Sequence, residues 1–263
     1  GLKRAGISMD GMEAVHDKFR GSIGSWKLTL DGIRNSLEAG MRVSLRVTVT
    51  NRNVQELPAL FDLAEREGIP RVCVYHLAYA GRGEKLLRFD LKHEERRKMV
   101  EYVFERTIES YAKGNKLEVL TVDNHTDAAY LQMWADKNMP DQSSRIRSLQ
   151  SMNGGSTAGK GMGNIDNLGN VHPDQFWWNQ TNGNVKERKF SEIWEDDSID
   201  LLAKLRNRKS HLPHDCKNCK WLSICNGNLR VRAESASGDS FGMDPACYLT
   251  EEERQTQPIG VGS

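Results

Sequence analysis

The sequence predicts an α/β protein, in which a parallel β-sheet with crossover helices precedes a smaller part of mixed α and β structure. Three observations carry this prediction. Stretches rich in β-branched residues alternate with amphipathic helical stretches over residues 1–150. Each helical stretch is followed by a glycine, a common helix end. From residue 151 onward glycine and asparagine become frequent, and three cysteines then fall within ten residues.

Three stretches have the composition of buried parallel strands. In the first, alternate residues such as Val43, Leu45 and Val47 form one apolar face, and the other two are short apolar runs. The expected strands are RVSLRVTVT (42–50), RVCVYHL (71–77) and KLEVLTV (116–122).

Apolar residues recur at helical spacing between these strands, in residues 26–37, 57–64 and 100–111. Glycines 40, 68 and 114 follow these stretches and are expected to end the helices. Strands that alternate with helices pair in parallel through right-handed crossovers. Because a closed eight-fold barrel needs about 250 residues, we expect part of a barrel or a small open sheet.

The second part has its own pattern. The pair Gly169-Asn170 between NIDN and VHP predicts a hairpin. We expect KFSEIW to contain the end of a strand and SIDLLAKLRNR to form a short helix. A domain boundary is expected near residue 150, and the last residues, 257–263, are expected to be a flexible tail.

Composition limits the function classes. Lys and Arg total 37 and Asp and Glu total 36, which gives the 263-residue chain a formal net charge of +1. This balance favours neither nucleic acid nor a membrane as a partner, and we expect neither. The chain shows no signal-peptide pattern and no apolar run of membrane-spanning length. We expect a cytoplasmic protein, and in a reducing compartment clustered cysteines more often bind metal than form disulfides.

The cysteines follow the pattern C-x2-C-x5-C-x21-C, formed by Cys216, Cys219, Cys225 and Cys247. A C-x2-C pair can place two thiolates on one metal site through a tight turn. The spacing leaves three alternatives open: a 4Fe-4S cluster, a structural zinc ion, and thiols without a ligand. Cys73 lies inside an expected strand, so we assign it to the core.

The segment from Lys204 to Arg232 is strongly basic, with eight Lys or Arg residues and one acidic residue, Asp215. An all-thiolate metal site is negatively charged, so these cations could balance it. They could equally bind an anionic substrate or form a solvated surface.

Several segments together identify a family resemblance. They are ISMDG with HDKFRG, RVTVTNRNVQELPALFDLAEREGI, HLAYAGRG, NIDNLGNVHPDQFWW, FSEIW, CKNCKWLSICNGNLRVRA and DPACYL. In these segments the chain resembles radical S-adenosylmethionine enzymes with a SPASM-type C-terminal domain, particularly those of heme d1 biosynthesis and the alternative heme pathway. The resemblance implies the C-terminal portion of a partial radical SAM barrel in residues 1–150. It implies a small α+β SPASM domain that binds an auxiliary cluster in residues 151–256.

Two departures from the family pattern matter. The C-x3-C-x2-C motif that holds the S-adenosylmethionine-cleaving cluster does not occur in the chain, so we expect a C-terminal fragment that is inactive alone. In the family's two-cluster pattern, cysteines occupy the places of Asp174 and Leu229. The resemblance therefore implies one auxiliary 4Fe-4S cluster, ligated by the four cysteines named above.

The resemblance also implies the chemistry. S-adenosylmethionine and a second 4Fe-4S cluster are expected only with the missing N-terminal part. The radical formed there would attack a side chain of a tetrapyrrole, siroheme-derived or coproporphyrin-type, and lead to propionate removal or oxidation. A ferredoxin or flavodoxin would supply electrons.

Candidate residues follow from the resemblance, although none of them is identified as catalytic. The cofactor-binding candidates for S-adenosylmethionine are Ser8, Asp10 and Arg20. The substrate-binding candidates are Arg230, Arg232, Trp177 and Trp178. Two other functions remain as alternatives: a radical SAM/SPASM maturase that modifies peptides, and a zinc-stabilised module that binds an anionic partner.

Overall fold

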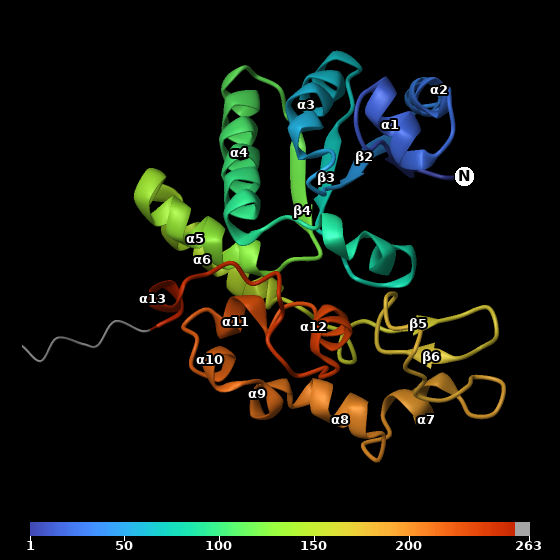
Figure 1. The fold of residues 1–263 in the computed structure, drawn as a ribbon, viewed down its shortest axis with the longest axis vertical. Coiled ribbons are helices and arrows are strands. Elements are labelled where there is room, and N and C mark those ends of the chain that lie inside the picture. The colour runs from blue at the N-terminus through green and yellow to red at the C-terminus, as the bar shows by residue number, and fades with distance from the viewer. Residues whose placement is uncertain (256–263) are drawn as a thin grey trace, which may run out of the picture. The chain divides into compact units, whose positions relative to one another are not determined.

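The computed structural model describes residues 1–255, which fold into two compact units (Figure 1). Unit 1 comprises Gly1–Leu77 and Leu86–Asp123, and unit 2 comprises Ala78–Lys85 and the chain from Asn124 onward. The tail expected at 257–263 lies outside the described residues. Within residues 1–255, no helix is both long enough and apolar enough to cross a membrane.

Unit 1 contains one four-stranded sheet. All neighbouring strands pair in parallel, and their order in the sheet is their order in the chain. The strands are β1 (Arg4–Ser8), β2 (Arg42–Thr48), β3 (Arg71–Tyr75) and β4 (Glu118–Val122). The three strands expected from the sequence are therefore confirmed, with the parallel pairing that their alternation with helices predicts.

Helices connect these strands. They are α1 (Glu13–Arg20), α2 (Ser25–Glu38), α3 (Leu57–Arg66) and α4 (His93–Ala112), with short 3₁₀ segments at Val54–Glu56 and Gly81–Phe89. The three expected helices are α2, α3 and α4, which pack against the strands (Figure 1). Gly40 adopts a positive φ of 74° just after α2, a conformation that favours glycine and ends the helix.

The two faces of the sheet in unit 1 differ. Val43, Leu45 and Val47 of β2 are fully buried in the core, which Leu60 and Phe61 of α3 also join. Because side chains alternate along a strand, the residues between them, such as Arg46, lie on the other face. We call that second face the inner face of the sheet.

Unit 2 is built mainly from helices. Two longer ones, α5 (Thr126–Asn138) and α6 (Pro140–Asn153), pack against each other and against α11. The other helices are α7 (Phe190–Trp194), α8 (Asp200–Arg206), α9 (Arg208–His211), α10 (His214–Lys217), α11 (Leu222–Cys225), α12 (Arg230–Ser237) and α13 (Glu251–Arg254). The expected hairpin is confirmed, since β5 (Asn164–Ile165) and β6 (Val171–His172) pair antiparallel.

One local prediction is wrong. KFSEIW does not hold the end of a strand, because Phe190–Trp194 forms helix α7. The helical spacing of four residues brings Phe190 and Trp194 together, and their rings stack with centroids 5.4 Å apart. Ile193 is buried on the same short helix. Apolar contacts at helical spacing therefore outweigh the strand propensity of the aromatic residues.

The compact units divide the chain earlier than the expected domain boundary does. Unit 2 resumes at Asn124 and so includes α5 and α6, which precede residue 151. Its apolar core contains Trp177, Leu205, Leu229 and Val231. Compactness does not decide where a family's domain begins, so the boundary near residue 150 stays a prediction.

Candidate metal centre

Short helices and turns of unit 2 position the first three cysteines. Cys216 lies in α10, and the N–H of Cys219 donates to its carbonyl at 3.2 Å, which closes a tight turn between the two residues. Cys225 ends α11 and is followed by Asn226, Gly227 and Asn228, all with positive φ. These are residue types that tolerate the left-handed region, so the local sequence reverses the chain directly after Cys225.

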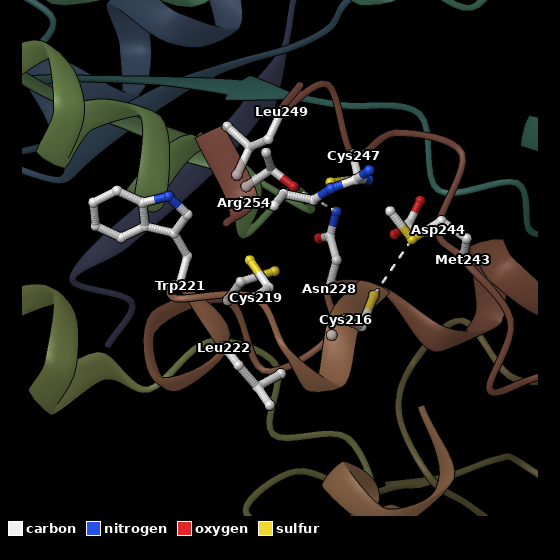
Figure 2. A pocket seen from close by; sticks show the side chains of 13 residues that line it. Cys216, Cys219, Trp221, Leu222, Asn228, Met243, Asp244, Cys247, Leu249 and Arg254 are labelled. Atoms are coloured by element: carbon white, nitrogen blue, oxygen red, sulfur yellow. Dashed lines mark hydrogen bonds between the residues drawn. The ribbon is translucent and has the colours of Figure 1, made fainter. Parts of the chain in front are cut away.

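The four expected ligands line one pocket. Figure 2 shows Cys247 on a segment separate from the one that carries Cys216 and Cys219. The pocket contains about 400 Å³ that protein atoms do not fill, and Met243 also lines it, with its sulfur 3.4 Å from that of Cys216. The structure thus brings Cys247 to the C-x2-C-x5-C loop, as the spacing predicts, and leaves Cys73 buried in unit 1.

The thiols surround a space rather than a single point. Four thiolates on one zinc ion lie about 3.8 Å apart, as a tetrahedron with 2.3 Å bonds requires. Four thiols around a pocket fit a larger ligand with separated attachment points, such as a 4Fe-4S cube.

Burial affects the protonation of these thiols. It raises the pKa of Cys216 to about 11, and it raises the pKa values of Cys219, Cys225 and Cys247 as well. Without a positively charged ligand the thiols are therefore neutral near pH 7. Ligation by metal requires thiolates, so the charge of the metal must offset the cost of ionising them in this buried place.

Two buried arginines lie beside the pocket without a carboxylate partner. Arg230 is 1% exposed and donates to the carbonyls of Gly227, Ser240 and Gly242. Arg208 is 3% exposed and donates to three further carbonyls, those of Ser156, Ala158 and Asn226.

Neither arginine makes an ion pair with the carboxylates of residues 1–255, and the Nε atom of each lacks a hydrogen-bond partner there. A buried charge without a partner is costly. The carboxylates of Asp244 and Asp174 favour the charged forms of Arg230 and Arg208 from a distance, and a cluster held by four thiolates would add further negative charge. The residues present therefore fit a thiolate-ligated cluster.

An ion pair joins the segments on the two sides of the pocket. Nε of Arg232 lies 2.7 Å from Oδ1 of Asp244, and both side chains are buried. Asp244 also accepts the backbone N–H groups of Leu229 at 2.9 Å and Ala246 at 2.8 Å. The carboxylate thus ties the chain that follows Cys225 to the chain that precedes Cys247.

A second polar network supports the same turn. The amide of Asn228 donates to Oδ1 of Asn124 at 2.6 Å and accepts the backbone N–H of His125 at 2.8 Å. Asn124 in turn donates to the carbonyl of Ala246 at 3.2 Å. Sequence reasoning missed Asn124 and Asp244, and the only signal for Asp244 was its position three residues before Cys247.

The structure places the other substrate candidates in different surroundings. Trp177 is fully buried in the core of unit 2, whereas Trp178 is 57% exposed beside His172. Helix α12 carries Arg230 and Arg232, and both are buried with protein partners. A substrate contact by any of the four stays a prediction.

The candidates for binding S-adenosylmethionine lie in unit 1. A guanidinium nitrogen of Arg20 lies 2.6 Å from Oδ2 of Asp10, which is buried. Ser8 is exposed at the end of β1. Burial raises the pKa of Asp10, although the charge of Arg20 opposes this effect. The structure brings Asp10 and Arg20 together, and their role toward a cofactor stays a prediction.

Comparison with known proteins gives close sequence relatives. No family model matches the sequence. Fe-coproporphyrin III synthase of Methanosarcina barkeri is 49% identical over 257 residues, which cover 96% of this chain and 64% of the relative. Pre-heme d1 synthase of Dinoroseobacter shibae is 40% identical over 258 residues, or 97% of this chain and 64% of the relative. An AdoMet-dependent heme synthase of M. barkeri is 29% identical over 94% of this chain and 68% of the relative. The chain thus spans about two thirds of the length of these relatives.

Two solved structures have the same fold as this chain. SuiB of Streptococcus suis, bound to its precursor peptide SuiA, matches with a TM-score of 0.67 at 18% identity over 94% of this chain and 53% of that one. The structure of anSMEcpe with bound AdoMet matches with a TM-score of 0.65 at 16% identity over 93% of this chain and 61% of that one. Both are radical S-adenosylmethionine enzymes of the SPASM type. This chain is a homologue of the Fe-coproporphyrin III, pre-heme d1 and AdoMet-dependent heme synthases, and its parallel α/β sheet has the fold of the radical S-adenosylmethionine enzymes SuiB and anSMEcpe.

Proposed function

We propose that this chain is part of a radical S-adenosylmethionine enzyme that modifies side chains of a tetrapyrrole, and that unit 2 is its SPASM-type domain with one auxiliary 4Fe-4S cluster. The observation that carries the proposal is the pocket of four cysteines, with two buried guanidinium groups beside it that lack a carboxylate partner. The names of two relatives, Fe-coproporphyrin III synthase and pre-heme d1 synthase, support a tetrapyrrole as the substrate class.

In this proposal Cys216, Cys219, Cys225 and Cys247 hold the cluster, which when bound supplies a one-electron redox centre next to the substrate. The protein contributes the surroundings. Arg208 and Arg230 balance the negative charge of the ligated site, and the carboxylate of Asp244 fixes the two segments that carry ligands. The partial burial of the four thiols limits the access of water to the centre.

Ser8, Asp10 and Arg20 are proposed to contribute to binding of S-adenosylmethionine in the complete enzyme. Radical cleavage of that cofactor requires a further cluster, for which the sequence of this chain contains no C-x3-C-x2-C motif. Electrons would come from a ferredoxin or a flavodoxin. A peptide-modifying maturase is the second candidate, because the SuiB structure of the same fold contains a precursor peptide.

The chain alone is expected not to cleave S-adenosylmethionine reductively. The four cysteines of unit 2 are occupied in this proposal, and Cys73 is a single buried thiol. The measurement is the yield of 5′-deoxyadenosine from the reconstituted chain with dithionite, against a sample without protein. Production above that background would contradict the assignment of the cysteines to an auxiliary cluster alone.

Trp178 offers the proposed substrate a flat apolar surface, because its ring is 57% exposed whereas that of Trp177 is fully buried. An aromatic contact contributes about 0.5–1.5 kcal/mol beyond area burial, so Trp178→Ala should bind coproporphyrin III roughly three- to tenfold more weakly. Phe190→Ala, which removes another exposed ring of unit 2, is the matched control and should bind like wild type. Binding is measured by absorption titration.

The same titration tests the two arginines of α12 and the substrate class. Iron is counted in each Arg230→Ala and Arg232→Ala sample. Weaker porphyrin binding with full iron content supports a substrate contact, whereas loss of binding only with loss of iron assigns the arginines to the cluster. If the wild-type chain binds a SuiA-like peptide and no porphyrin, the tetrapyrrole proposal is wrong.

A further inference from the structure

The inner face of the unit 1 sheet carries a line of polar side chains. The register of the parallel strands aligns Ser8, Arg46, Cys73 and Leu120 in one row across all four strands. Tyr75 lies two residues beyond Cys73 on β3, and therefore on the same face. Helices α2, α3 and α4 contact β2, β3 and β4 respectively, and the valine and leucine side chains of β2 are buried on the opposite face.

Arg46 stands out in this row because no acidic group balances it. Its side chain is exposed and makes no ion pair or hydrogen bond with any of residues 1–255. Two other cations of this face have a carboxylate partner: Glu118 pairs with Arg71 at 2.7 Å and with Arg42 at 3.8 Å. Arg46 is thus an unpaired cation near the carboxyl end of β2, a central strand of the sheet.

Gly6 allows the guanidinium of Arg46 to lie across the edge strand β1. A Cβ atom built on Gly6 would overlap the guanidinium, so any side chain there would displace it. The φ of Gly6 is not positive, which means that the backbone itself does not require glycine. The absence of a side chain at Gly6 thus leaves room for the guanidinium of Arg46 beside β1.

The charge of Arg46 also affects the pKa values of two residues on β3. Burial raises the pKa values of Tyr75 and Cys73, and in both cases Arg46 acts in the opposite direction. The phenol of Tyr75 has no hydrogen-bond partner within the described part of the chain. A guanidinium and a phenolic hydroxyl on one face provide donors for an anionic ligand.

We propose that Arg46 forms a carboxylate-binding subsite on the inner face of the sheet and binds a propionate of the tetrapyrrole substrate. The proposal rests on the proposed function. A guanidinium binds a carboxylate through two parallel N–H···O bonds, which suits the planar end of a propionate. The carboxylate of S-adenosylmethionine has the same chemistry, so the test compares both ligands.

The test uses the reconstituted 263-residue chain and three probes: coproporphyrin III, its uncharged tetramethyl ester, and S-adenosylmethionine. Arg46→Met should bind coproporphyrin III at least about tenfold more weakly, since a hydrogen bond to a charged group contributes that much. Binding of the ester should not change. Arg42→Met, on the same strand and face but paired with Glu118, is the matched control and should bind all three probes like wild type.

Two further variants test the geometry. Arg46→Lys keeps the charge but loses the two-point contact, and should bind coproporphyrin III with intermediate affinity. Gly6→Ala keeps Arg46 and displaces its guanidinium, and should weaken binding of the acid but not of the ester.

The outcomes separate the inference from the function on which it rests. A selective loss of coproporphyrin III binding in Arg46→Met supports the propionate subsite. A selective loss of S-adenosylmethionine binding supports the carboxylate subsite and moves the ligand to the cofactor. Two outcomes would show that the subsite is wrong while the proposed function stands, both with a wild-type chain that binds the porphyrin. In the first, Arg46→Met binds coproporphyrin III as tightly as wild type. In the second, its affinities for the acid and for the ester fall by the same factor. If wild type binds no probe, both are wrong.

Discussion

Replacement of Arg232 by methionine is expected to destabilise unit 2 by about 3–5 kcal/mol. The variant leaves the carboxylate of Asp244 buried and without its partner. Although burial alone would raise the pKa of Asp244, the charge and hydrogen bonds of Arg232 hold that pKa below its ordinary value. The free energy of unfolding, measured by urea titration of the reconstituted protein, reports the loss.

Two controls isolate the buried charge. Arg206→Met removes the arginine of a more exposed ion pair with Asp197. It should lower the free energy of unfolding by at most about 1 kcal/mol. The double variant Arg232→Met/Asp244→Leu removes both charges and should recover part of the loss, since it leaves no unpaired ion. An Arg232→Met protein within 1 kcal/mol of wild type would show that the pair does not hold the two ligand-bearing segments together.

Replacement of any one of the four pocket cysteines by alanine is expected to remove most of the iron or to change the absorption spectrum of the cluster. Each lost thiolate leaves one iron of the cube without a protein ligand. Cys225 should be among the most sensitive of the four, because burial raises its pKa and so favours the neutral thiol when the metal is absent. Iron and sulfide are counted per chain in each reconstituted variant.

Cys73→Ala is the matched control, since Cys73 is a buried thiol of unit 1 that lies on the sheet and not in the pocket. It should retain the iron content of wild type. Loss of iron in Cys73→Ala together with full retention in Cys247→Ala would contradict the ligand assignment.

The features that the sequence predicts correctly are those with a local pattern. The alternation in β2 and the glycine after α2 depend on neighbouring residues, and both are confirmed. The cysteine spacing is also a local pattern, and the role of Cys216, Cys219 and Cys225 as ligands stays a prediction. The aromatic residues of α7 were misread because a five-residue stretch holds too little periodicity to separate strand from helix.

Features that depend on contacts between distant segments could not be predicted in this way. Asn228 meets Asn124 across 104 positions of the chain. No spacing pattern identifies Asp244 as the partner of Arg232, or Arg46 as an unpaired cation. The basic segment left three roles open for its arginines, which were to balance a thiolate site, to bind a substrate or to face solvent, and the fold buries Arg208, Arg230 and Arg232 against protein groups.

The central claim is that unit 2 holds one iron–sulfur cluster between its four cysteines. Its most direct test is metal and sulfide analysis of the anaerobically reconstituted wild-type chain, combined with Mössbauer spectroscopy. We predict about four iron and four sulfide per chain in one 4Fe-4S species, with the brown visible absorption of such a cluster. One zinc ion per chain in a colourless protein, or no stoichiometric metal, would contradict the claim.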